Sequence, residues 1–599
     1  MHSATSFIKR SLGFVRRHIG KPVSDGFPID VWTDSAYQAW FDAHVPSDAE
    51  LSRQRIESGS FSYQPVFSLI VPLYKTPLDY LKVMSDSVLN QTYGNLELVL
   101  VNASPESAEL SHAVEDLSAS DDRVKVVTLD DNYGITENTN HGIDAATGDF
   151  CCFLDHDDYI DANLLFEYVK ALNEDSSIDV MYCDEDLVVW DEEGKRFTHQ
   201  NPFIKPQFSP ELLLCRNYIV HLMTIRRSII DSMPRPDSSF DGSQDYNMVL
   251  YATHVARRVH GVQKVMYHWR ISETSTATNP DSKPYSLRSC RKAQWDQLDR
   301  RGIDGSIVRS GLYLLHNVWL EHGAQSISVI CDIEDVRRDA QWFVEFFDHS
   351  VGSALPQLIL TGDSSSLDMA LLGKSYRGEL VFIDCANANR YTRLNAASKA
   401  AAGDFLVFLD AGCVLSTPDA LGQLIAMASL DGIGVSSPKT LYRDGSNKTY
   451  GVAVTPERIM PMYRGYQDDF PGYQCNIRAF QNVSAVGLQG LTTSRELFNR
   501  LGGFDERFTD ELGAVDYCIR VREGGYRLVA MPTVKLELDE ECPEQRYDCA
   551  LNAQDYSDVG IAKFDAKWPG LRFKGDPYLN VNLDQSSSYC QIPHTVSEK

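Results

Sequence analysis

The chain has 599 residues, which is too long for a single hydrophobic core, so we expect two or three domains. Hydrophobic residues make up 43% and charged residues 23%, which are the proportions of a soluble globular protein. The formal net charge of −27 argues against a nucleic-acid partner, because a phosphate backbone is bound through Lys and Arg. An anionic substrate would need a metal ion or a local group of Arg and His side chains.

The 13 cysteines are odd in number and never occur in C-x-x-C spacing, so neither a zinc site nor a disulfide framework is expected. We therefore predict a reducing, cytoplasmic location. No apolar run in the sequence approaches the length of a transmembrane helix.

The first 21 residues carry basic side chains interleaved with apolar ones and contain no acid. They lack the long apolar core and the cleavage site of a secretory signal. Two interpretations stay open, namely an amphipathic helix peripheral to the cytoplasmic membrane and a frayed terminus. Residues 22–65 are predicted to form a short helical lead-in, with Tyr37, Trp40 and Phe41 as apolar anchors.

Strands and helices alternate through the next part of the chain. Apolar runs at 67–74, 96–101 and 124–129 predict strands, and helical spacing is found over 79–91 and 135–146. This alternation predicts a parallel sheet that is covered by helices on both faces. No G-x-G-x-x-G follows the first strand, which disfavours a dinucleotide-binding fold with that fingerprint.

The most informative stretch is the uncharged run Phe150–Leu154, which is followed by Asp155, Asp157 and Asp158. The run is too short for a helix and predicts a buried strand. Strand carboxyl ends face the ligand crevice of open α/β sheets. Carboxylate oxygens suit Mg²⁺ or Mn²⁺, which commonly keep substrate phosphates as their other ligands. The alternative is a solvated acidic turn.

Several motifs, in chain order, resemble those of the family 2 glycosyltransferases: Ser68–Tyr74, Leu89–Tyr93, Glu97–Val101, Asn132–Ile135, Ala145–Asp149 and Phe153–Asp158. The resemblance implies an inverting enzyme of the GT-A fold that uses a nucleotide-sugar donor. Later motifs resemble the rhamnosyltransferase-like branch: Tyr182–Asp186, Lys205–Pro210, Asn217–His221, Gly242–Tyr246 and Tyr267–Arg270. Several motifs at consistent spacing are more specific than any one alone.

The resemblance gives roles to individual residues. Asp155 and Asp157 are expected to hold the metal, which stabilises the departing diphosphate as a Lewis acid. Inversion needs one general base on the acceptor hydroxyl, and Asp245 corresponds to it. The alternative interpretation of Asp245 is a helix N-cap, because a helix-like stretch follows it, and the two roles are compatible. His268 is expected as a further metal ligand or diphosphate contact, and Arg270 as a bidentate phosphate contact, unless both are ordinary surface residues.

The other expected site residues form two sets. The nucleotide-sugar side comprises Pro72, Tyr74, Asn102, Asn132, Asn140, Asp155 and Arg270. The acceptor side comprises Asp184, Glu185, Asp186, Gln244 and Trp269, with solvation as the alternative for the three acids. The family usually has an aspartate at position 102 that contacts the donor's base. Asparagine can both donate and accept a hydrogen bond, so it can still recognise a pyrimidine base. The identity of the nucleotide-sugar stays open.

The second half of the chain contains a weaker copy of the first. Residues 145–155 align with residues 400–410, and Asn140 falls on Asn395 at the same offset. Two later stretches, 502–507 and 515–520, also resemble family 2 sequence. We therefore predict an α/β protein with two tandem GT-A domains, each built on a Rossmann-like, mostly parallel sheet.

The predicted organisation has five parts. They are a basic terminus with a helical lead-in at 1–65, a catalytic domain at 66–301, a linker at 302–325, a second domain at 326–545 and a C-terminal extension at 546–599. The extension is expected to be solvated and to contribute little chemistry.

The two copies differ where the chemistry is expected. Asp157 aligns with Gly412 and Asp158 with Cys413, which leaves Asp410 alone as a poor metal site. We predict that the second domain keeps the fold, has lost or strongly changed sugar transfer, and binds the growing glycan or braces the first domain.

Counting along the chain places Asp516 where the first copy has Asp245, and places Asp539 where the first copy has His268. The opposing interpretation is a second active site with unusual ligands, whose best candidates are Asp384, Asp505 and Asp516.

The sequence thus predicts a metal-dependent inverting glycosyltransferase of cell-envelope polysaccharide biosynthesis. It would move a hexose or deoxyhexose, with rhamnose suggested by resemblance only, from a nucleotide-sugar to a polysaccharide or lipid-linked glycan. Two alternatives stay open. One is a non-catalytic glycan-binding scaffold, and the other is a haloacid-dehalogenase-like phosphotransferase with Asp155 as its nucleophile. The phosphotransferase would carry this motif on its first strand, whereas Asp155 follows the fourth predicted strand.

Overall fold

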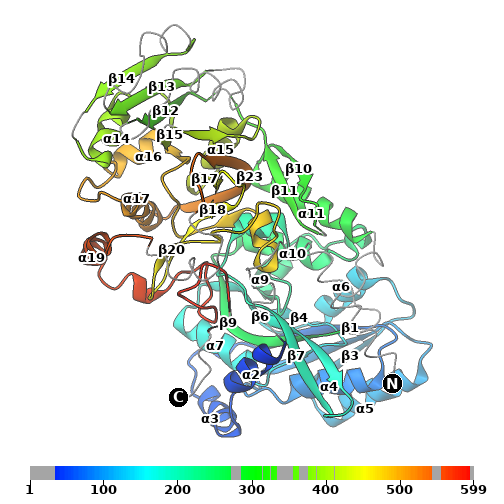
Figure 1. Cartoon of the computed structure of the whole chain (residues 1–599). Helices are drawn as coiled ribbons and strands as arrows, with labels where there is room; N and C mark the ends of the chain where they lie inside the picture. The colour runs from blue at the N-terminus through cyan, green and yellow to red at the C-terminus, as the bar shows by residue number, and fades with distance from the viewer. Residues whose placement is uncertain are drawn as a thin grey trace. The chain divides into compact units, whose positions relative to one another are not determined.

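The computed structural model describes residues 34–271, 285–312, 314–323, 325–333, 355–362, 376–385, 388–410, 412–542, 555–591 and 593. The described residues divide into two compact units (Figure 1), within Asp30–Gln297 and Leu298–Gln591, here called the amino-terminal and carboxy-terminal units. The basic stretch at 1–21 lies outside the described residues, so its amphipathic helix stays a prediction. None of the helices described here is long and apolar enough to cross a membrane.

The amino-terminal unit is built on a mixed sheet in the order β3-β2-β1-β4-β8-β6-β9-β5, with β7 paired to β6. Its strands are β1 (Phe67–Leu73), β2 (Leu96–Asn102), β3 (Val124–Thr128), β4 (Phe150–Phe153), β5 (Tyr159–Ile160), β6 (Ile178–Asp191), β7 (Arg196–Phe203), β8 (Thr224–Arg226) and β9 (Arg258–Arg270). Strands β1 to β4 run parallel, whereas β8 is antiparallel to both of its neighbours, β4 and β6. The strands predicted in the first half are confirmed.

The helices of this unit are α2 (Asp34–His44), α3 (Asp48–Ser58), α4 (Leu78–Leu89), α5 (Ala108–Ser120), α6 (Ile135–Ala145), α7 (Leu164–Glu174), α8 (Pro210–Cys215), α9 (Arg227–Ser232) and α10 (Gln244–Val255), and α11 (Ser286–Arg301) runs across the unit boundary. The predicted lead-in is the pair α2 and α3. Its predicted anchors Tyr37, Trp40 and Phe41 are all buried.

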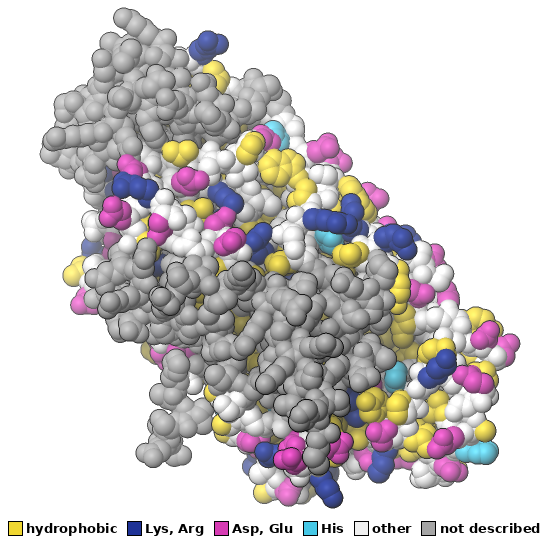
Figure 2. All heavy atoms as spheres, turned by 45° about the vertical axis from the view of Figure 1, so that its right-hand side comes forward, with side chains coloured by type: hydrophobic (Ala, Val, Ile, Leu, Met, Phe, Trp, Pro, Cys, Tyr) yellow, Lys and Arg dark blue, Asp and Glu magenta, His cyan; other side chains and the backbone are white. Residues whose placement is uncertain are grey.

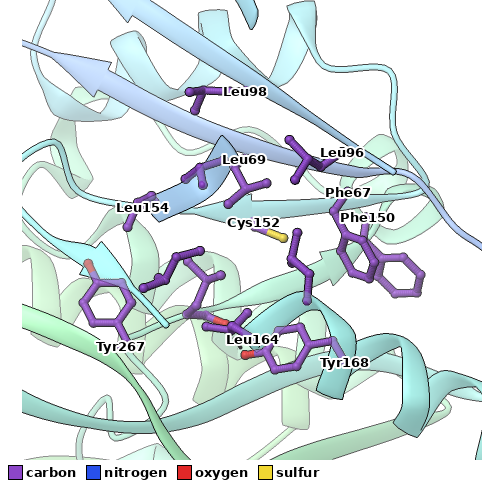
Figure 3. Packing of buried hydrophobic residues seen from close by; sticks show 14 of the residues in the cluster. Phe67, Leu69, Leu96, Leu98, Phe150, Cys152, Leu154, Leu164, Tyr168 and Tyr267 are labelled. Atoms are coloured by element: carbon purple, nitrogen blue, oxygen red, sulfur yellow. Dashed lines mark hydrogen bonds between the residues drawn. The ribbon is translucent and has the colours of Figure 1, made fainter. Parts of the chain in front are cut away.

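The core lies against β1, β2 and β4. Figure 3 shows Leu69, Leu98 and Cys152 facing Leu164 and Tyr168 of α7 in one buried cluster. Helix α6 covers the opposite face of the sheet, and it approaches so closely that only glycine fits at one position. A Cβ on Gly142 would lie 2.4 Å from the Cγ2 atom of Ile70. Helices therefore cover both faces here, as predicted, and the buried run of β4 fixes where the following acids emerge.

The carboxy-terminal unit contains a second mixed sheet in the order β14-β13-β12-β15-β22-β17-β23-β16, with β18 paired to β17 and β21 to β23. Its strands are β12 (Ile327–Asp332), β13 (Gln357–Gly362), β14 (Leu380–Asp384), β15 (Phe405–Asp410), β16 (Cys413–Leu415), β17 (Ile433–Leu441), β18 (Asn447–Thr449), β21 (Gln481–Asn482), β22 (Leu491–Ser494) and β23 (Arg527–Leu538). Its helices are α14 (Arg390–Lys399), α15 (Ala420–Ala428), α16 (Arg495–Arg500), α17 (Leu512–Glu523) and α19 (Asp558–Lys567). A separate hairpin joins β19 (Val452–Val454) to β20 (Ile459–Pro461).

The second sheet repeats the first, strand for strand. Strands β12, β13, β15 and β22 take the places of β1, β2, β4 and β8, and the parallel and antiparallel pairings agree. A buried hydrogen-bond network also recurs. Ser68 Oγ donates to Glu97 Oε1 at 2.6 Å and accepts from Gly148 N at 2.8 Å. The same bonds join Ser328, Gln357 and Gly403. The predicted α/β architecture with two tandem domains is confirmed.

Two predicted segments differ from the structure. The expected linker at 302–325 contains an antiparallel hairpin of β10 (Gly305–Arg309) and β11 (His316–Leu320). The expected solvated extension is wrong for residues 555–591, which pack into the carboxy-terminal unit. Phe564 and Tyr589 are buried there, because composition alone does not reveal which aromatic side chains find a partner.

The net negative charge is not gathered into one face in the view that Figure 2 gives. On the described surface seen there, Asp and Glu side chains lie among Lys and Arg side chains. An acidic site must therefore be found from local geometry rather than from the overall charge.

Candidate active site

The chain leaves β4 through a tight turn that spreads three carboxylates over different environments. The Asp158 N–H donates to the Asp155 carbonyl at 3.3 Å. The Asp155 side chain is 55% exposed, whereas Asp158 is fully buried and Asp157 lies between these extremes. One acid therefore faces solvent while another points into the protein.

Asp158 is held by the last residues of β9. The Tyr267 hydroxyl donates to Asp158 Oδ2, and the Arg270 N–H donates to Oδ1 at 2.9 Å. Burial raises the pKa of Asp158, and the charges of Asp157 and Asp155 raise it further. Burial and the charge of Asp155 likewise raise the pKa of Asp157. Adjacent carboxylates of this kind are relieved by a nearby cation.

His221 joins the acids from the segment that precedes β8. Its Nε2 lies 3.8 Å from Asp155 Oδ2, and its Nδ1 lies 3.2 Å from Glu185 Oε2. The imidazole stacks on Tyr267, with ring centroids 4.2 Å apart and an interplanar angle of 5°. Asp155, Asp158 and His221 offer ligand atoms that all lie within 4.8 Å of one another. Carboxylate oxygen and imidazole nitrogen fit Mn²⁺ or Mg²⁺ chemically.

The sequence singled out His221 only as part of a motif. A usable signal was its position just before an apolar strand, but no local rule says that this strand is the neighbour of β4. The pairing of Cys152 with Thr224 is what brings the two segments together.

Asp245 lies in the first turn of α10 and belongs to the same neighbourhood. Burial raises its pKa, the charge of His221 lowers it and the charge of Asp155 raises it. Its Oδ2 accepts a hydrogen bond of 2.8 Å from Asn217 Nδ2. The expected helix-capping role is wrong, because Ser243 occupies the N-cap and Asp245 is the second helical residue. Its carboxylate lies near the backbone N–H groups of the first turn and also accepts from Asn217.

His268 lies in a different cluster. Its Nδ1 is 2.7 Å from Asp186 Oδ1, and its Nε2 is 3.2 Å from Asp161 Oδ1. Burial lowers its pKa, but the charges of Asp186 and Asp161 prevail and raise it to about 10. His199 and the Tyr37 hydroxyl of α2 bind the other oxygen of Asp186 at 2.8 and 2.7 Å. The cluster is buried, and the bond from Tyr37 to Asp186 joins α2 to the sheet. Asp186, His199 and His268 also offer ligand atoms within 4.8 Å of one another.

The three acids expected on the acceptor side are not solvated. Asp184, Glu185 and Asp186 are buried in β6. Lys205 donates from its N–H to Asp184 Oδ1 at 2.7 Å and from Nζ to Glu185 Oε2 at 2.9 Å. The other two expected residues lie nearer the surface. Trp269 packs at 5.8 Å from the His221 ring, and Gln244 Oε1 accepts from the Gly242 N–H at 3.1 Å.

The three asparagines expected on the nucleotide-sugar side are tied to the protein itself. Asn102 accepts from the Ser104 N–H and donates to Ser111 Oγ, each at 3.1 Å. Asn132 Oδ1 accepts from the Gly134 N–H and from Asn138 Nδ2, and Asn140 Nδ2 donates to the Pro236 carbonyl. These side chains therefore fix the local loop conformation.

The other residues of this set differ in exposure. Pro72 is buried in β1, whereas Tyr74 just after the strand is 41% exposed. The Arg270 guanidinium lies 4.1 Å from the Tyr80 ring centroid and 4.9 Å from that of Phe197. Its Nε and Nη2 are buried and have no hydrogen-bond partner among the described residues. Two buried donors of this kind suit an anionic ligand.

In the carboxy-terminal unit a guanidinium lies beside the acid at the end of the corresponding strand, β15. Arg390 Nη2 lies 2.5 Å from Asp410 Oδ1, and its Nη1 lies 3.0 Å from Glu511 Oε1. Gln489 Nε2 donates to Asp410 Oδ2. At the offset that aligns Asp155 with Asp410, Arg390 falls on Ile135.

The counterpart of Asp245 is also neutralised from within the protein. Asp516 is fully buried, and its carboxylate is bound by Arg520 at 3.0 Å, Lys567 at 2.6 Å and the Trp568 indole at 2.9 Å. The other two candidates of this unit differ. Asp505 is paired with Arg507 and Lys567, and Asp384 is exposed at the end of β14.

The strand register shows that Asp539, which was found by counting residues along the chain, is not the counterpart of His268. Tyr159 pairs with His268 in the first sheet, and Val414, at the common offset from Tyr159, pairs with Glu537. Glu537 rather than Asp539 therefore occupies that position.

Residues 68–233 match the family model described as Glycosyl transferase family 2. This segment is therefore a family 2 glycosyltransferase domain. It is 28% identical over 547 residues to the uncharacterized protein y4gI of Sinorhizobium fredii, covering 89% of this chain and 59% of that protein. It is 25% identical over 561 residues to the O-antigen biosynthesis protein RfbC of Myxococcus xanthus, covering 93% of this chain and 43% of that protein. The chain thus spans about half the length of these curated relatives.

Among solved structures, the chain is similar to TarS residues 1–349 of S. aureus, with 19% identity, a TM-score of 0.31 and coverage of 39% of this chain and 65% of that one. It is also similar to the mannosyltransferase PcManGT of Pyrobaculum calidifontis, with 15% identity, a TM-score of 0.31 and coverage of 48% and 75%.

Proposed function

We propose that the amino-terminal unit, which contains this family 2 glycosyltransferase domain, is an inverting, metal-dependent transferase that moves a sugar from a nucleotide-sugar to a hydroxyl of a glycan. The observation that supports the proposal best is the group of Asp155, Asp158 and His221 at the carboxyl end of β4. Asp245 lies close enough for its pKa to depend on the charges of His221 and Asp155. These groups come from three segments that are far apart in the sequence. Such convergence at a strand end is typical of a substrate crevice.

The acids that follow β4 and His221 would hold the divalent cation. When bound, the cation would supply positive charge to the diphosphate as it leaves the sugar. Arg270 would bind the same diphosphate through its two buried donors, which carry a fixed charge and a planar geometry suited to phosphate oxygens.

Asp245 would act as the general base on the acceptor hydroxyl. Its carboxylate stays in place because Asn217 binds one oxygen, and burial raises its pKa, which makes the ionised form a stronger base. The proton moves to Asp245 as the acceptor oxygen attacks the anomeric carbon and the bond from that carbon to the diphosphate breaks. A single displacement of this kind inverts the anomeric centre.

The acceptor and the donor sugar are proposals from likeness. The name of the Myxococcus relative refers to O-antigen biosynthesis, which supports a polysaccharide or lipid-linked acceptor. The motif resemblance supports a hexose or deoxyhexose such as rhamnose. The basic terminus at 1–21 would suit a cytoplasmic enzyme peripheral to the membrane that carries such an acceptor.

The carboxy-terminal unit would not transfer sugar. This proposal is supported by the pairing of Asp410 with Arg390 and of Asp516 with Lys567, since both acids already have a cation. The unit would instead bind glycan or brace the catalytic unit.

The test is release of nucleoside diphosphate by the full chain across a panel of nucleotide-sugars with Mn²⁺ and glycan acceptors. Turnover should be lost in Asp155→Ala and Asp245→Asn, and kept in Asp116→Asn, which changes an exposed acid on α5. Glycan binding without turnover of any donor would instead support the scaffold. Activity only with a UDP-hexose would exclude rhamnose as the transferred sugar.

A further inference from the structure

We propose that His221 is a direct ligand of the metal in the amino-terminal unit, and that a buried Lys205–Glu185 pair orients it. The inference rests on the proposed function for the presence of a cation, and it replaces His268 by His221 in the ligand set. Four features of the structure support it.

The first feature is the spacing of the ligand atoms. Two ligands at about 2.1 Å from one cation can lie at most about 4.2 Å apart. His221 Nε2 and Asp155 Oδ2 are 3.8 Å apart, within that limit. Asp158 completes a group whose ligand atoms lie within 4.8 Å of one another, so small side-chain movements suffice for a common cation.

The second feature is the tautomer that the surroundings favour. His221 Nδ1 faces Glu185 Oε2 at 3.2 Å, and a carboxylate can only accept. Donation from Nδ1 leaves the lone pair of Nε2 pointing toward Asp155. A carboxylate behind the histidine is the usual arrangement around metal-bound imidazoles, because it fixes the ring and strengthens the ligand.

The third feature is a rigid support. Lys205 is buried, and its Nζ donates to Glu185 Oε2 at 2.9 Å, to the Ile219 carbonyl at 2.7 Å and to the His221 carbonyl at 2.8 Å. Its three Nζ bonds hold Glu185 and the backbone carbonyls of Ile219 and His221. Tyr267 stacks on the imidazole and also donates to Asp158, so one residue positions two of the ligands.

The fourth feature comes from the other unit. Cys152 pairs with Thr224, and the residue aligned with Cys152, Val407, pairs with Thr492. Three positions before these threonines stand His221 and Gln489. Gln489 donates to Asp410, the counterpart of Asp155. The side chain at this position therefore faces the acid at the strand end in both units. His221 presents a nitrogen lone pair to Asp155, whereas Gln489 presents an amide N–H to Asp410.

His268 belongs to a different cluster of potential ligands. Its two nitrogens face Asp186 and Asp161 at 2.7 and 3.2 Å. It groups with Asp186 and His199 rather than with Asp155, so it is not placed to share a cation with the acid at the end of β4.

The experiment measures Mn²⁺ alone with the full chain, by pulsed EPR for imidazole ¹⁴N coupling and by titration for affinity. The wild-type protein should show ¹⁴N coupling. His221→Gln, which copies Gln489, should remove the coupling and weaken Mn²⁺ binding by about tenfold or more. His268→Gln is the matched control and should keep the coupling.

A second variant keeps the inference open to refutation if His221→Gln does not fold. Glu185→Gln should retain the ¹⁴N coupling and weaken Mn²⁺ binding by about 10–100-fold, as loss of an orienting partner does. Coupling that persists in His221→Gln, coupling that disappears in His268→Gln, or no coupling in the wild type would each overturn the inference. Coupling in a protein that turns over no donor would refute the proposed function alone.

Discussion

The two units build the same sheet and treat the acid at the end of its central strand in opposite ways. In the amino-terminal unit Asp155 is 55% exposed, and its neighbour is the imidazole of His221. In the carboxy-terminal unit Asp410 is 32% exposed and is bound by Arg390 and Gln489. The carboxylate of Asp155 is therefore left to bind a cation from outside the protein. The carboxylate of Asp410 is instead neutralised by the guanidinium of Arg390.

The comparison shows how a site of this kind can be lost without loss of the fold. An acid in a crevice needs a partner, because an unpaired and partly buried charge is costly. Replacing a bound ion by an arginine at the first position of the helix that precedes this strand removes that need. Ile135 and Arg390 stand at this position in the two units, and this difference adds to those at Gly412, Cys413 and Gln489.

The largest effect should come from the same substitution at the two counterpart acids. Asp245→Asn should lower kcat by about 10²–10⁴-fold, because the general base is lost. Asp516→Asn should leave kcat unchanged and lower the free energy of unfolding by about 3–5 kcal/mol, because Arg520 and Lys567 lose a buried partner. Steady-state kinetics and urea unfolding of both variants check this pair. A loss of kcat in Asp516→Asn would mean that the second crevice is active.

A second variant transfers the arginine from one unit to the other. Ile135→Arg should place a guanidinium beside Asp155, as Arg390 lies beside Asp410, and should lower kcat by about 10²–10³-fold. Mn²⁺ affinity should fall with it, because the positive charges compete for one carboxylate. Ile135→Leu is the control and should keep both properties. Unchanged Mn²⁺ binding in Ile135→Arg would show that Arg390 does not stand in for a metal.

The sequence was sufficient for the parts of the site that follow local rules. A short apolar run bounded by acids predicts a buried strand with carboxylates at its end, and β4 with Asp155 confirms it. The repeat at residues 400–410 predicted a second domain, because both copies keep the same apolar strand.

The sequence was not sufficient where partners come from distant segments. His221 and Glu185 meet only because β8 and β6 are neighbours in the sheet, and no local pattern states that order. The same limit applies to Asp576, whose carboxylate accepts from the Val454 N–H at 2.7 Å. A run rich in Tyr, Asp and Asn looks solvated until such partners are known.

A smaller effect should appear in the pH dependence of the proposed reaction. Burial raises the pKa of Asp245 above its ordinary value of 3.8, and only the ionised form can take a proton. The value of kcat/KM should therefore rise tenfold per pH unit below this pKa and then level off. Asn217→Ala removes a donor to the carboxylate, which disfavours the charged form, so the rise should move to higher pH. A profile that does not move would mean that another group controls the acid limb.

The smallest effect should be on the stability of the carboxy-terminal unit. Arg390→Ile gives this unit the residue that stands at position 135 and leaves Asp410 and Glu511 without their shared cation. The free energy of unfolding should fall by about 1–3 kcal/mol, between the values for exposed and buried ion pairs. The freed carboxylates should then bind Mn²⁺, so added Mn²⁺ should raise the melting temperature of this variant more than that of Arg390→Lys, which keeps the charge. Equal shifts in the two variants would mean that the crevice has lost its capacity for a metal through Gly412 and Cys413, and that the arginine came later.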